Sequence, residues 1–219
     1  PATLHSVVAA ALTMNACMLH EAVNYEGNTL TGAERAALRR HPLDGADLLR
    51  AAGVADPDWL DCVLMHHEND DGSGYPEGKI GDAVPRSARL IALADRYCAY
   101  VSARNYRRSL LPQEALRKLR EEHPGAADAA LVSLFETQLG ATPPGTLVRL
   151  DGGALAVVAR RADASGALGL HLLLEADGAS SARRCSSGEP DCAIGGALHE
   201  DEAGVRFSMK SVWGELAAL

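Results

Sequence analysis

The sequence predicts a mainly α-helical bundle followed by a small β-rich C-terminal subdomain. Short helical segments joined by short loops fill residues 1–140, which is typical of a bundle. Aromatic residues make up only 4% of the 219 residues, so the core must consist mostly of alanine, leucine and valine, which suits closely packed helices. At residues 141–145, Ala-Thr-Pro-Pro-Gly, the pattern changes to strand-like segments. We therefore expect two domains, at 1–140 and 141–219.

The helical domain begins with an apolar segment and continues through signals for helix starts. Thr31 and Glu34 have the spacing of a capping box, in which the hydroxyl and the carboxylate each accept from a backbone N–H. Asp56 or Asp58 is expected to cap the helix that follows them. The expected helices cover residues 5–22, 31–42 (ending near His41 and Pro42), 43–52, 59–67, 86–104, a segment starting at Pro112, and 126–139.

The C-terminal domain shows the alternation of a small antiparallel sheet. Residues 146–150 and 154–161 flank an Asp-Gly-Gly turn and predict a β-hairpin. Residues 168–175 add a third strand, and residues 177–189, rich in Gly, Ala and Ser, predict a flexible loop. The segment 206–213 fits either a strand or a short helix.

Composition and charge exclude several classes of function. The formal net charge of −8 argues against a protein that binds DNA or RNA generally, and against one that binds anionic membrane surfaces. No apolar run reaches the roughly 18 residues that a membrane-spanning helix requires. We see no signal peptide, and we expect a cytoplasmic location.

The five cysteines fall into two groups. Cys17, Cys62 and Cys98 lie in helical patterns and are expected to be small core residues in a reducing compartment. Cys185 and Cys192 flank a Ser-Ser-Gly-Glu-Pro-Asp loop. We expect them to be unpaired, with a disulfide or a metal-binding role as the minor alternative.

The most informative stretch runs from the paired histidines His66 and His67 through a glycine-rich loop to a helix that carries Asp95. Imidazoles and a carboxylate together suit a first-row divalent metal, because both ligand types donate well to it. A loop as rich in glycine as residues 71–78 suits close backbone approach or a tight turn.

These residues carry a resemblance to a known family. The pattern HHExxDGxGYP is formed by His66, His67, Glu68, Asp71, Gly72, Gly74, Tyr75 and Pro76. The downstream segments AVPRSARLIALADRY and RNYR continue the similarity. Over roughly residues 12–150 the chain resembles HD-GYP domains, the helical, metal-dependent family that hydrolyses cyclic di-GMP in bacteria. The resemblance implies an HD-type helical bundle, with a further ligand-bearing helix before residue 1.

The resemblance also implies a set of metal ligands. The expected ligands are His41, which precedes a proline, the pair His66 and His67, and Asp95. Glu68 and Asp71 are expected to orient the histidines, with solvated loop acids as the alternative. For Asp95 the alternative is a helix cap or an ion-pair partner of Arg89 or Arg96.

The chain departs from the family at a His-Asp doublet that usually stands in the sequence ALLHDIGK. Residues 11–18 read ALTMNACM, so Met14 and Asn15 occupy the doublet, Cys17 the glycine and Met18 the lysine. A bridging aspartate offsets the repulsion between two cations, whereas asparagine offers only a neutral carbonyl. A thioether is a poor ligand for the harder divalent ions, and the lost lysine removes a cation that stabilises charge on a reacting phosphate.

A second alignment places the doublet at His20 and Glu21. It leaves too few residues before Leu30, where the next helix approaches, so we favour Met14 and Asn15. Hydrolysis in this family requires two metals. We therefore expect no intact catalytic residues, no dinuclear centre, and either no metal or one residual divalent ion of iron, manganese or magnesium.

The residues that would contact the nucleotide match the family pattern better than the metal ligands do. Arg104, Tyr106 and Arg107 resemble the element through which family members hold guanine and phosphate, and Tyr75 is expected to support the same pocket. The alternative for the arginines is a solvated helix end. Cys98 stands where the family has an aspartate, which weakens the expectation of tight binding.

Three hypotheses for function follow. The first is a degenerate HD-GYP module that binds cyclic di-GMP, a diguanylate cyclase domain of the GGDEF type through the GYP loop, or both, without hydrolysis. The second is a cyclic di-GMP phosphodiesterase with an altered metal-ligand set. The third is a dimerisation or scaffold module that works as a homodimer. We favour the first.

Overall fold

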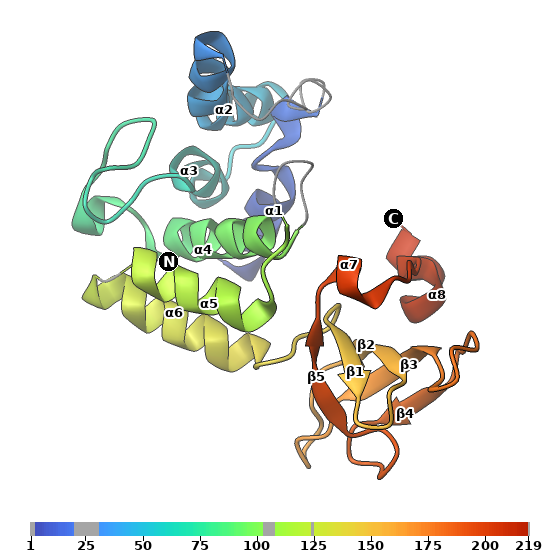
Figure 1. Cartoon of the computed structure of the whole chain (residues 1–219). Coiled ribbons are helices and arrows are strands. Elements are labelled where there is room, and N and C mark those ends of the chain that lie inside the picture. The colour runs from blue at the N-terminus through green and yellow to red at the C-terminus, as the bar shows by residue number, and fades with distance from the viewer. Residues whose placement is uncertain (1–2, 20–30, 103–107, 124, 219) are drawn as a thin grey trace. The chain divides into compact units, whose positions relative to one another are not determined.

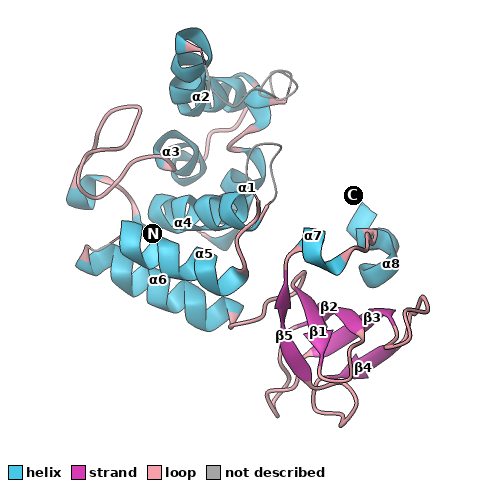
Figure 2. Ribbon diagram, viewed as in Figure 1, coloured by secondary structure: helices cyan, strands magenta, loops and turns pink. Residues whose placement is uncertain are grey.

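The computed structural model describes residues 3–19, 31–102, 108–123 and 125–218. The chain forms two compact units. The first comprises residues 1–108 and 119–133, and the second comprises residues 109–118 and 134–219. Helices fill the first unit, and a five-stranded antiparallel sheet with short helices forms the second (Figures 1 and 2), which confirms the predicted fold class. The predicted boundary between residues 140 and 141 stays a prediction.

The helices of the described residues, with their short 3-10 turns, lie in the order α1 Leu4–Thr13, η1 Ala16–Met18, α2 Gly32–Ala51, α3 Pro57–Met65, η3 Gly81–Ala83, α4 Arg86–Val101, α5 Pro112–Glu122 and α6 Ala126–Leu139. The strands are β1 Leu147–Leu150, β2 Leu155–Arg160, β3 Gly169–Leu174, β4 Arg184–Ser186 and β5 Ile194–Leu198, followed by α7 Glu200–Ala203, α8 Met209–Trp213 and η4 Glu215–Ala218. No helix among the described residues is long and apolar enough to cross a membrane.

Caps and side-chain bonds fix the helices α1 and α3 together. Asp56 caps α3 by accepting from the backbone N–H groups of Asp58 and Trp59. The same carboxylate accepts from the hydroxyl of Ser6 on α1 at 2.6 Å. At the other end of α1, the indole of Trp59 donates to the hydroxyl of Thr13 at 2.9 Å. Two polar contacts thus set the register of α1 on α3.

The first helix is shorter than the sequence predicts. It ends at Thr13 and is followed by a 3-10 turn, whereas a helix over residues 5–22 was expected. The hydroxyl of Thr13 donates to the carbonyl of Ala9 at 2.7 Å, and such a local side-chain bond competes with continuation of the helix. Residues 20–22 lie outside the described part of the chain.

Helix α2 corrects the expected break at Pro42. The capping box of Thr31 and Glu34 opens the helix as predicted. The helix then runs without interruption to Ala51, with the proline inside it. A proline removes one helix bond and favours a kink. Here the freed carbonyl finds a side-chain partner, described below, and burial of Ala46 and Leu49 holds the second half of the helix in place.

The core of the first unit consists of small and aliphatic side chains, as the composition implies. Its buried members are Ala10, Ala46, Leu49, Leu60, Cys62, Val63 and Ile91. Cys62 is therefore a core residue as expected. Cys17 is only half-buried and Cys98 is exposed, so for Cys98 the expectation of a core position is wrong.

The sheet of the second unit has the strand order β4-β3-β2-β1-β5. The predicted hairpin is β1 and β2, in which Leu147 pairs with Val157 and Val148 with Ala156. Alternation places the first pair on one face and the second on the other. One face packs around Val148 and Cys192, and the opposite face packs under α7 and α8.

Two expectations about the C-terminal segments need correction. Residues 177–189 are not wholly a loop, because residues 184–186 form the edge strand β4 on β3. Cys185 and Cys192 form a disulfide, although unpaired thiols were expected. The undecided segment contains the short helix α8, for which Ser208 is the N-cap.

Candidate functional site

His41 lies in the middle of α2, and the next residue, Pro42, determines which way the imidazole faces. Proline has no N–H, so it cannot make the helix bond to the carbonyl of Leu38 four residues earlier. The Nδ1–H of His41 donates to this carbonyl instead, at 2.6 Å. The lone pair of the other ring nitrogen, Nε2, therefore points away from the helix backbone.

His66 follows the last residue of α3, where the backbone offers the same kind of partner. The last four carbonyls of an α-helix have no partner within the helix. The Nδ1–H of His66 donates to one of them, that of Val63, at 2.7 Å. The side chain is buried with no exposed surface. Both rings are thus oriented by backbone oxygens that the helices leave free.

The two rings meet through their remaining nitrogens. Nε2 of His41 lies 3.1 Å from Nε2 of His66. Because each Nδ1 donates to a carbonyl, two neutral rings direct two lone pairs at one point and cannot bond to each other. Two imidazole nitrogens on one ion, with bonds of about 2.1 Å, lie roughly 3 to 3.4 Å apart. The arrangement therefore fits a divalent cation between the rings.

His67 adds a third imidazole. Its ring centroid lies 4.9 Å from that of His41, and one ligand atom from each of His41, His66 and His67 falls within 4.8 Å of the others. Tyr75 stacks on His67 with centroids 4.7 Å apart, and the guanidinium of Arg39 lies 5.1 Å from the Tyr75 ring. The Tyr75 ring covers one side of the histidine cluster.

Burial keeps the three histidines neutral. Burial lowers the pKa of His66 to about 4, and repulsion from Arg96 and from the protonated form of His41 adds to the effect. Burial lowers the pKa of His67 to about 2, supported by the neighbouring imidazoles and Arg96. The pKa of His41 is also lowered, mainly by burial. Neutral imidazoles bind a metal without first losing a proton.

Asp95, the fourth expected ligand, is half-buried on α4. Its negative charge offsets part of the lowering of the His41 pKa and adds to the raising of the Tyr75 pKa, so the carboxylate lies near both side chains. It is not part of the tight group of ligand atoms that the three histidines form. The structure therefore brings three of the four expected ligands together and places the fourth beside them.

The turn after α1 lies against the helix that carries His41. The thiol of Cys17 donates to the carbonyl of His41 at 3.3 Å. A side chain at Gly45 would lie 3.4 Å from the carbonyl oxygen of Met14 and 3.6 Å from the sulfur of Cys17. Met14 packs on the apolar core, and Asn15 is exposed. Met18 is half-buried, whereas His20 and Glu21 lie outside the described residues.

Glu68 holds the glycine-rich loop and has different partners from those expected. The side chain is 2% exposed, and its carboxylate accepts from the backbone N–H groups of Glu77, Gly78 and Lys79 at 2.7, 3.1 and 3.0 Å. Its bonds are to the loop and not to the histidines. Asp71 is exposed and accepts from the backbone and hydroxyl of Ser73, as a solvated loop acid does.

Gly74 allows the loop to fold back onto the paired histidines. A side chain at this position would lie 2.5 Å from the carbonyl oxygen of His67, from the Cα of Glu68 and from the backbone nitrogen of Asn69. Only glycine permits so close an approach between two backbones. The backbone N–H of Tyr75 then donates to the carbonyl of His67 at 3.1 Å, which positions the tyrosine ring.

Arg89 closes the base of the loop, a role that the sequence reasoning missed. Its guanidinium donates to the carbonyl of Gly81 at 2.5 Å and pairs with the carboxylates of Asp70 at 2.7 Å and Asp128 at 3.2 Å. Its Nε–H donates to the carbonyl of Val84. The sequence signal is a cation inside the otherwise apolar run Ala-Arg-Leu-Ile-Ala-Leu-Ala.

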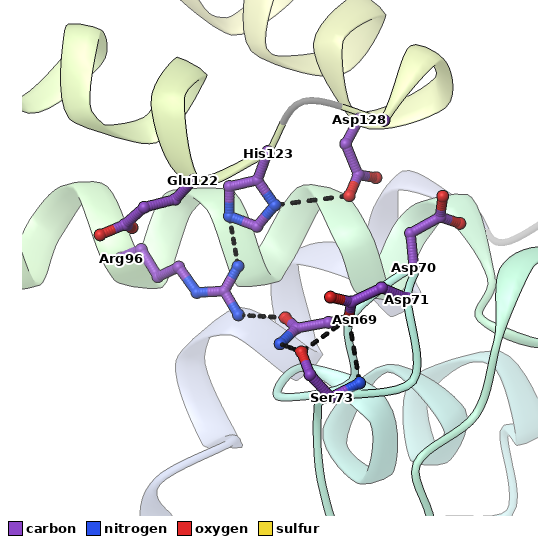
Figure 3. A pocket seen from close by; sticks show the side chains of 9 residues that line it. Asn69, Asp70, Asp71, Ser73, Arg96, Glu122, His123 and Asp128 are labelled. Atoms are coloured by element: carbon purple, nitrogen blue, oxygen red, sulfur yellow. Dashed lines mark hydrogen bonds and ion pairs between the residues drawn. The ribbon is translucent and has the colours of Figure 1, made fainter.

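A cavity of about 330 Å³ lies beside the loop (Figure 3), lined by Asn69, Asp70, Asp71, Ser73, Arg96, Glu122, His123, Gly125 and Asp128. Arg96 reaches from α4 between the loop and His123. It donates to the amide oxygen of Asn69 at 2.5 Å and to Nε2 of His123. The sequence reasoning did not single out His123, because only the fold brings it next to the loop.

The predicted nucleotide contacts Arg104, Tyr106 and Arg107 lie outside the described residues. Among the four expected contacts, Tyr75 alone is described, at the histidine cluster. Those three assignments stay predictions.

Comparison with known proteins identifies the class of domain. A sequence model of the HD domain family matches residues 3–131. A cyclic di-GMP phosphodiesterase of Pseudomonas aeruginosa is 37% identical over 129 residues, covering 59% of this chain and 31% of the relative.

Two further relatives match part of the chain. The cyclic di-GMP phosphodiesterase response regulator RpfG of Xanthomonas campestris is 34% identical, with coverage of 54% of this chain and 33% of the relative. A 3'3'-cGAMP-specific phosphodiesterase of Vibrio cholerae is 33% identical, with coverage of 47% and 23%. The chain spans a third or less of the length of these relatives.

Proposed function

Because this chain belongs to the HD domain family, as a member of the HD-GYP type, we propose that it is a module of cyclic di-GMP signalling that binds the nucleotide, a partner protein, or both, without hydrolysing the nucleotide. The relatives named as phosphodiesterases support the choice of nucleotide. The kept GYP loop, with its anchors Glu68 and Arg89, supports a binding role.

The observation that carries the proposal is the position of Met14 and Asn15. Their turn lies against α2 through the Cys17 bond to His41, and we align the two residues with the histidine and the aspartate of the family pattern. A neutral amide does not supply the anionic oxygen that holds two cations together, and a thioether ligates hard divalent ions poorly. Without two metals, the hydroxide that attacks a phosphate ester is not generated in the way this family requires.

One divalent ion still fits the imidazoles. His41, His66 and His67 would hold it, with Asp95 as the nearby carboxylate, and iron, manganese or magnesium is the expected ion. A single ion of this kind supplies a Lewis-acid contact for a phosphate oxygen. Tyr75, Arg104, Tyr106 and Arg107 would then hold the rest of the nucleotide, because planar guanidinium groups bind phosphate and guanine edges with two hydrogen bonds.

The test combines binding and turnover on one preparation. Titration calorimetry of the full chain with cyclic di-GMP should give saturable binding that Arg104→Ala abolishes and that Arg40→Ala, an exposed control on α2, leaves intact. Chromatography after incubation with manganese or iron should show no linear or mononucleotide product. Product formed at a rate that His41→Ala removes would overturn the proposal.

The convergence of the imidazole lone pairs favours a second candidate, a phosphodiesterase with an altered ligand set. A site whose nitrogens already face one point loses little orientational freedom when an ion binds. This candidate requires turnover that depends on His41, and it predicts that Asn15→Ala lowers the rate because the amide then completes the centre.

A scaffold role is the third candidate, and it requires neither turnover nor nucleotide binding. It predicts a homodimer, or a complex with a diguanylate cyclase domain, that Tyr75→Ala disrupts. Sedimentation of the free chain and of the mixture with such a domain measures this outcome.

A further inference from the structure

Outside the region that matches the HD domain family, one loop gathers two sulfurs and two carboxylates within eight residues. Cys185 on β4 and Cys192 form a disulfide across the loop. Glu189 and Asp191 lie between them, and one ligand atom each from Glu189, Asp191 and Cys192 falls within 4.8 Å of the others. Cys192 is completely buried, while both acids are exposed.

The loop is held in this shape by bonds that do not depend on the disulfide. The backbone N–H of Glu189 donates to the carbonyl of Ser186 at 2.9 Å, and that of Cys192 donates to the carbonyl of Glu189 at 3.0 Å. The carboxylate of Glu189 accepts from the backbone N–H of Ser186 at 2.8 Å. Ser187 exchanges two bonds with Leu168 at 2.8 and 2.9 Å, which fixes the loop to the start of β3.

A cation beside the loop favours the ionised form of the thiol once the disulfide is reduced. A guanidinium nitrogen of Arg183 lies 3.8 Å from the sulfur of Cys192 and 3.1 Å from the carboxylate of Asp191. A neighbouring arginine stabilises a thiolate, which is the form of cysteine that binds metals. It also offsets part of the negative charge that two thiolates and two carboxylates bring together.

We propose that this loop is a redox-gated metal site, in which Cys185, Cys192, Glu189 and Asp191 bind a zinc-like divalent ion when the disulfide is reduced. Thiolates with oxygen ligands around four positions suit zinc, which prefers tetrahedral sites. Two thiolates on such an ion lie about 3.8 Å apart for bonds of about 2.3 Å. The Cα atoms of Cys185 and Cys192 are 6.7 Å apart, so rotation of the two side chains suffices to open the sulfurs by that amount.

The two states are connected by a balanced reaction. A dithiol reductant gives two electrons and two protons to the disulfide, its own two sulfurs become a disulfide, and Cys185 and Cys192 become thiols. The ion then displaces the two thiol protons. In each state the same two residues remain linked, by a covalent bond or through the ion, so the buried Cys192 keeps its place among the core residues of the sheet.

Cobalt is the probe, because thiolate ligands give a sulfur-to-cobalt charge-transfer absorption that imidazole ligands do not. The full chain, reduced with a phosphine, should develop this absorption on titration with cobalt(II) and saturate at one ion, and zinc should remove it. The oxidised chain should show none. Cys185→Ser should abolish the absorption, whereas Cys98→Ser, at an exposed free cysteine, should leave it unchanged.

The acid variants keep both cysteines and the disulfide, so they test the site in a chain that still folds as the parent does. Glu189→Gln and Asp191→Asn should each weaken cobalt binding at least about tenfold, a loss that even outer partners of metal ligands produce. Glu200→Gln, outside the loop at the start of α7, is the control. The proposal is overturned if the reduced chain gives no saturable absorption, if the absorption survives Cys185→Ser, or if both acid variants bind as the parent does.

Discussion

The helices α2 and α3 and the turn after α1 border the same site, and they differ in what positions their side chains. The rings of His41 and His66 are oriented by backbone carbonyls that Pro42 and the end of α3 leave free. At the turn after α1, a ligand would depend on side-chain identity alone, and we propose that Met14 and Asn15 occupy the positions of the family's His-Asp doublet. The first kind of position is built into the fold, whereas the second can change by single substitutions that leave the fold intact.

The loop next to the histidines, like the two imidazole rings, is positioned by contacts with backbone groups. Glu68 and Arg89 anchor it through several backbone groups each, and Gly74 allows its close return to the chain. None of these contacts touches the doublet. The loop is therefore held in place independently of Met14 and Asn15, whose presence we expect to prevent hydrolysis.

The largest expected effect is on stability, from Arg89→Met. The variant leaves the nearly buried Asp128 without its guanidinium and breaks the closure at Gly81. Removing one partner of a buried ion pair costs about 3–5 kcal/mol in the free energy of unfolding. Urea unfolding followed by circular dichroism measures it. Arg86→Met, an exposed position on the same helix, should cost little, and equal losses in the two variants would contradict the assigned role.

Pro42→Ala should change the orientation of the His41 ring and the stability of the chain in opposite directions. The alanine supplies an N–H that competes with His41 for the carbonyl of Leu38, so the imidazole loses its fixed orientation. Metal affinity should fall about 10–100-fold, as when a partner that orients a ligand is lost. Stability should rise, because a proline inside a helix is unfavourable. Calorimetry with manganese and urea unfolding give the two values, and unchanged affinity would show that the proline does not orient the ring.

The burial of His123, next to Arg96, makes the stability of the folded chain depend on pH. Burial lowers the pKa of His123 below its ordinary value of 6.5, and the charge of Arg96 adds to this. The unfolded chain thus binds a proton at His123 more readily than the folded chain does. The contribution of the neutral His123 to the free energy of unfolding is therefore complete above pH 6.5, and it decreases as the pH falls below 6.5. His123→Gln should flatten the pH dependence of unfolding by at most about 1.4 kcal/mol per pH unit.

The control for that measurement is Gln113→Ala, at an exposed position on α5 that carries no titratable side chain. It should leave the slope of stability against pH nearly as it is in the parent. A slope that His123→Gln does not alter would mean that His123 is protonated equally in the folded and unfolded chains.

The smallest effect should come from Asn15→Ala, in the turn after α1. Asn15 is exposed and makes no side-chain cap bond to the turn that follows it. Substitutions at such surface positions usually change stability by less than about 0.5 kcal/mol. Manganese affinity, measured by calorimetry, should also stay within the error of the parent. A clear loss of affinity would make the amide a ligand and would favour the active phosphodiesterase.

Much of the fold could be predicted from the sequence, where local signals and the tertiary structure agree. The capping box at Thr31 and the hairpin around the Asp-Gly-Gly turn are strong local signals, and both are present. The break expected at Pro42 is wrong, because a histidine next to the proline satisfies the freed carbonyl and packing holds the helix together. The disulfide of Cys185 and Cys192 was only the minor alternative in the prediction, because loop composition does not reveal how close two cysteines lie.

The candidate site was predictable where a motif names its residues. His41, His66 and His67 were identified in this way, and the structure brings them together. The roles of Arg89 and His123 were not predictable, because their partners lie on segments far apart in the sequence. Glu68 has three backbone donors that only the folded loop presents to it.

Manganese stoichiometry tests the central claim most directly. Manganese suits nitrogen and oxygen ligands and not thiolates, so in the oxidised chain it reports the histidine cluster alone. Elemental analysis of the full chain, loaded with manganese and freed of excess ion, should give no more than one ion per chain, lost in His41→Ala. Two ions per chain, both lost in His41→Ala and accompanied by hydrolysis of cyclic di-GMP, would contradict the account.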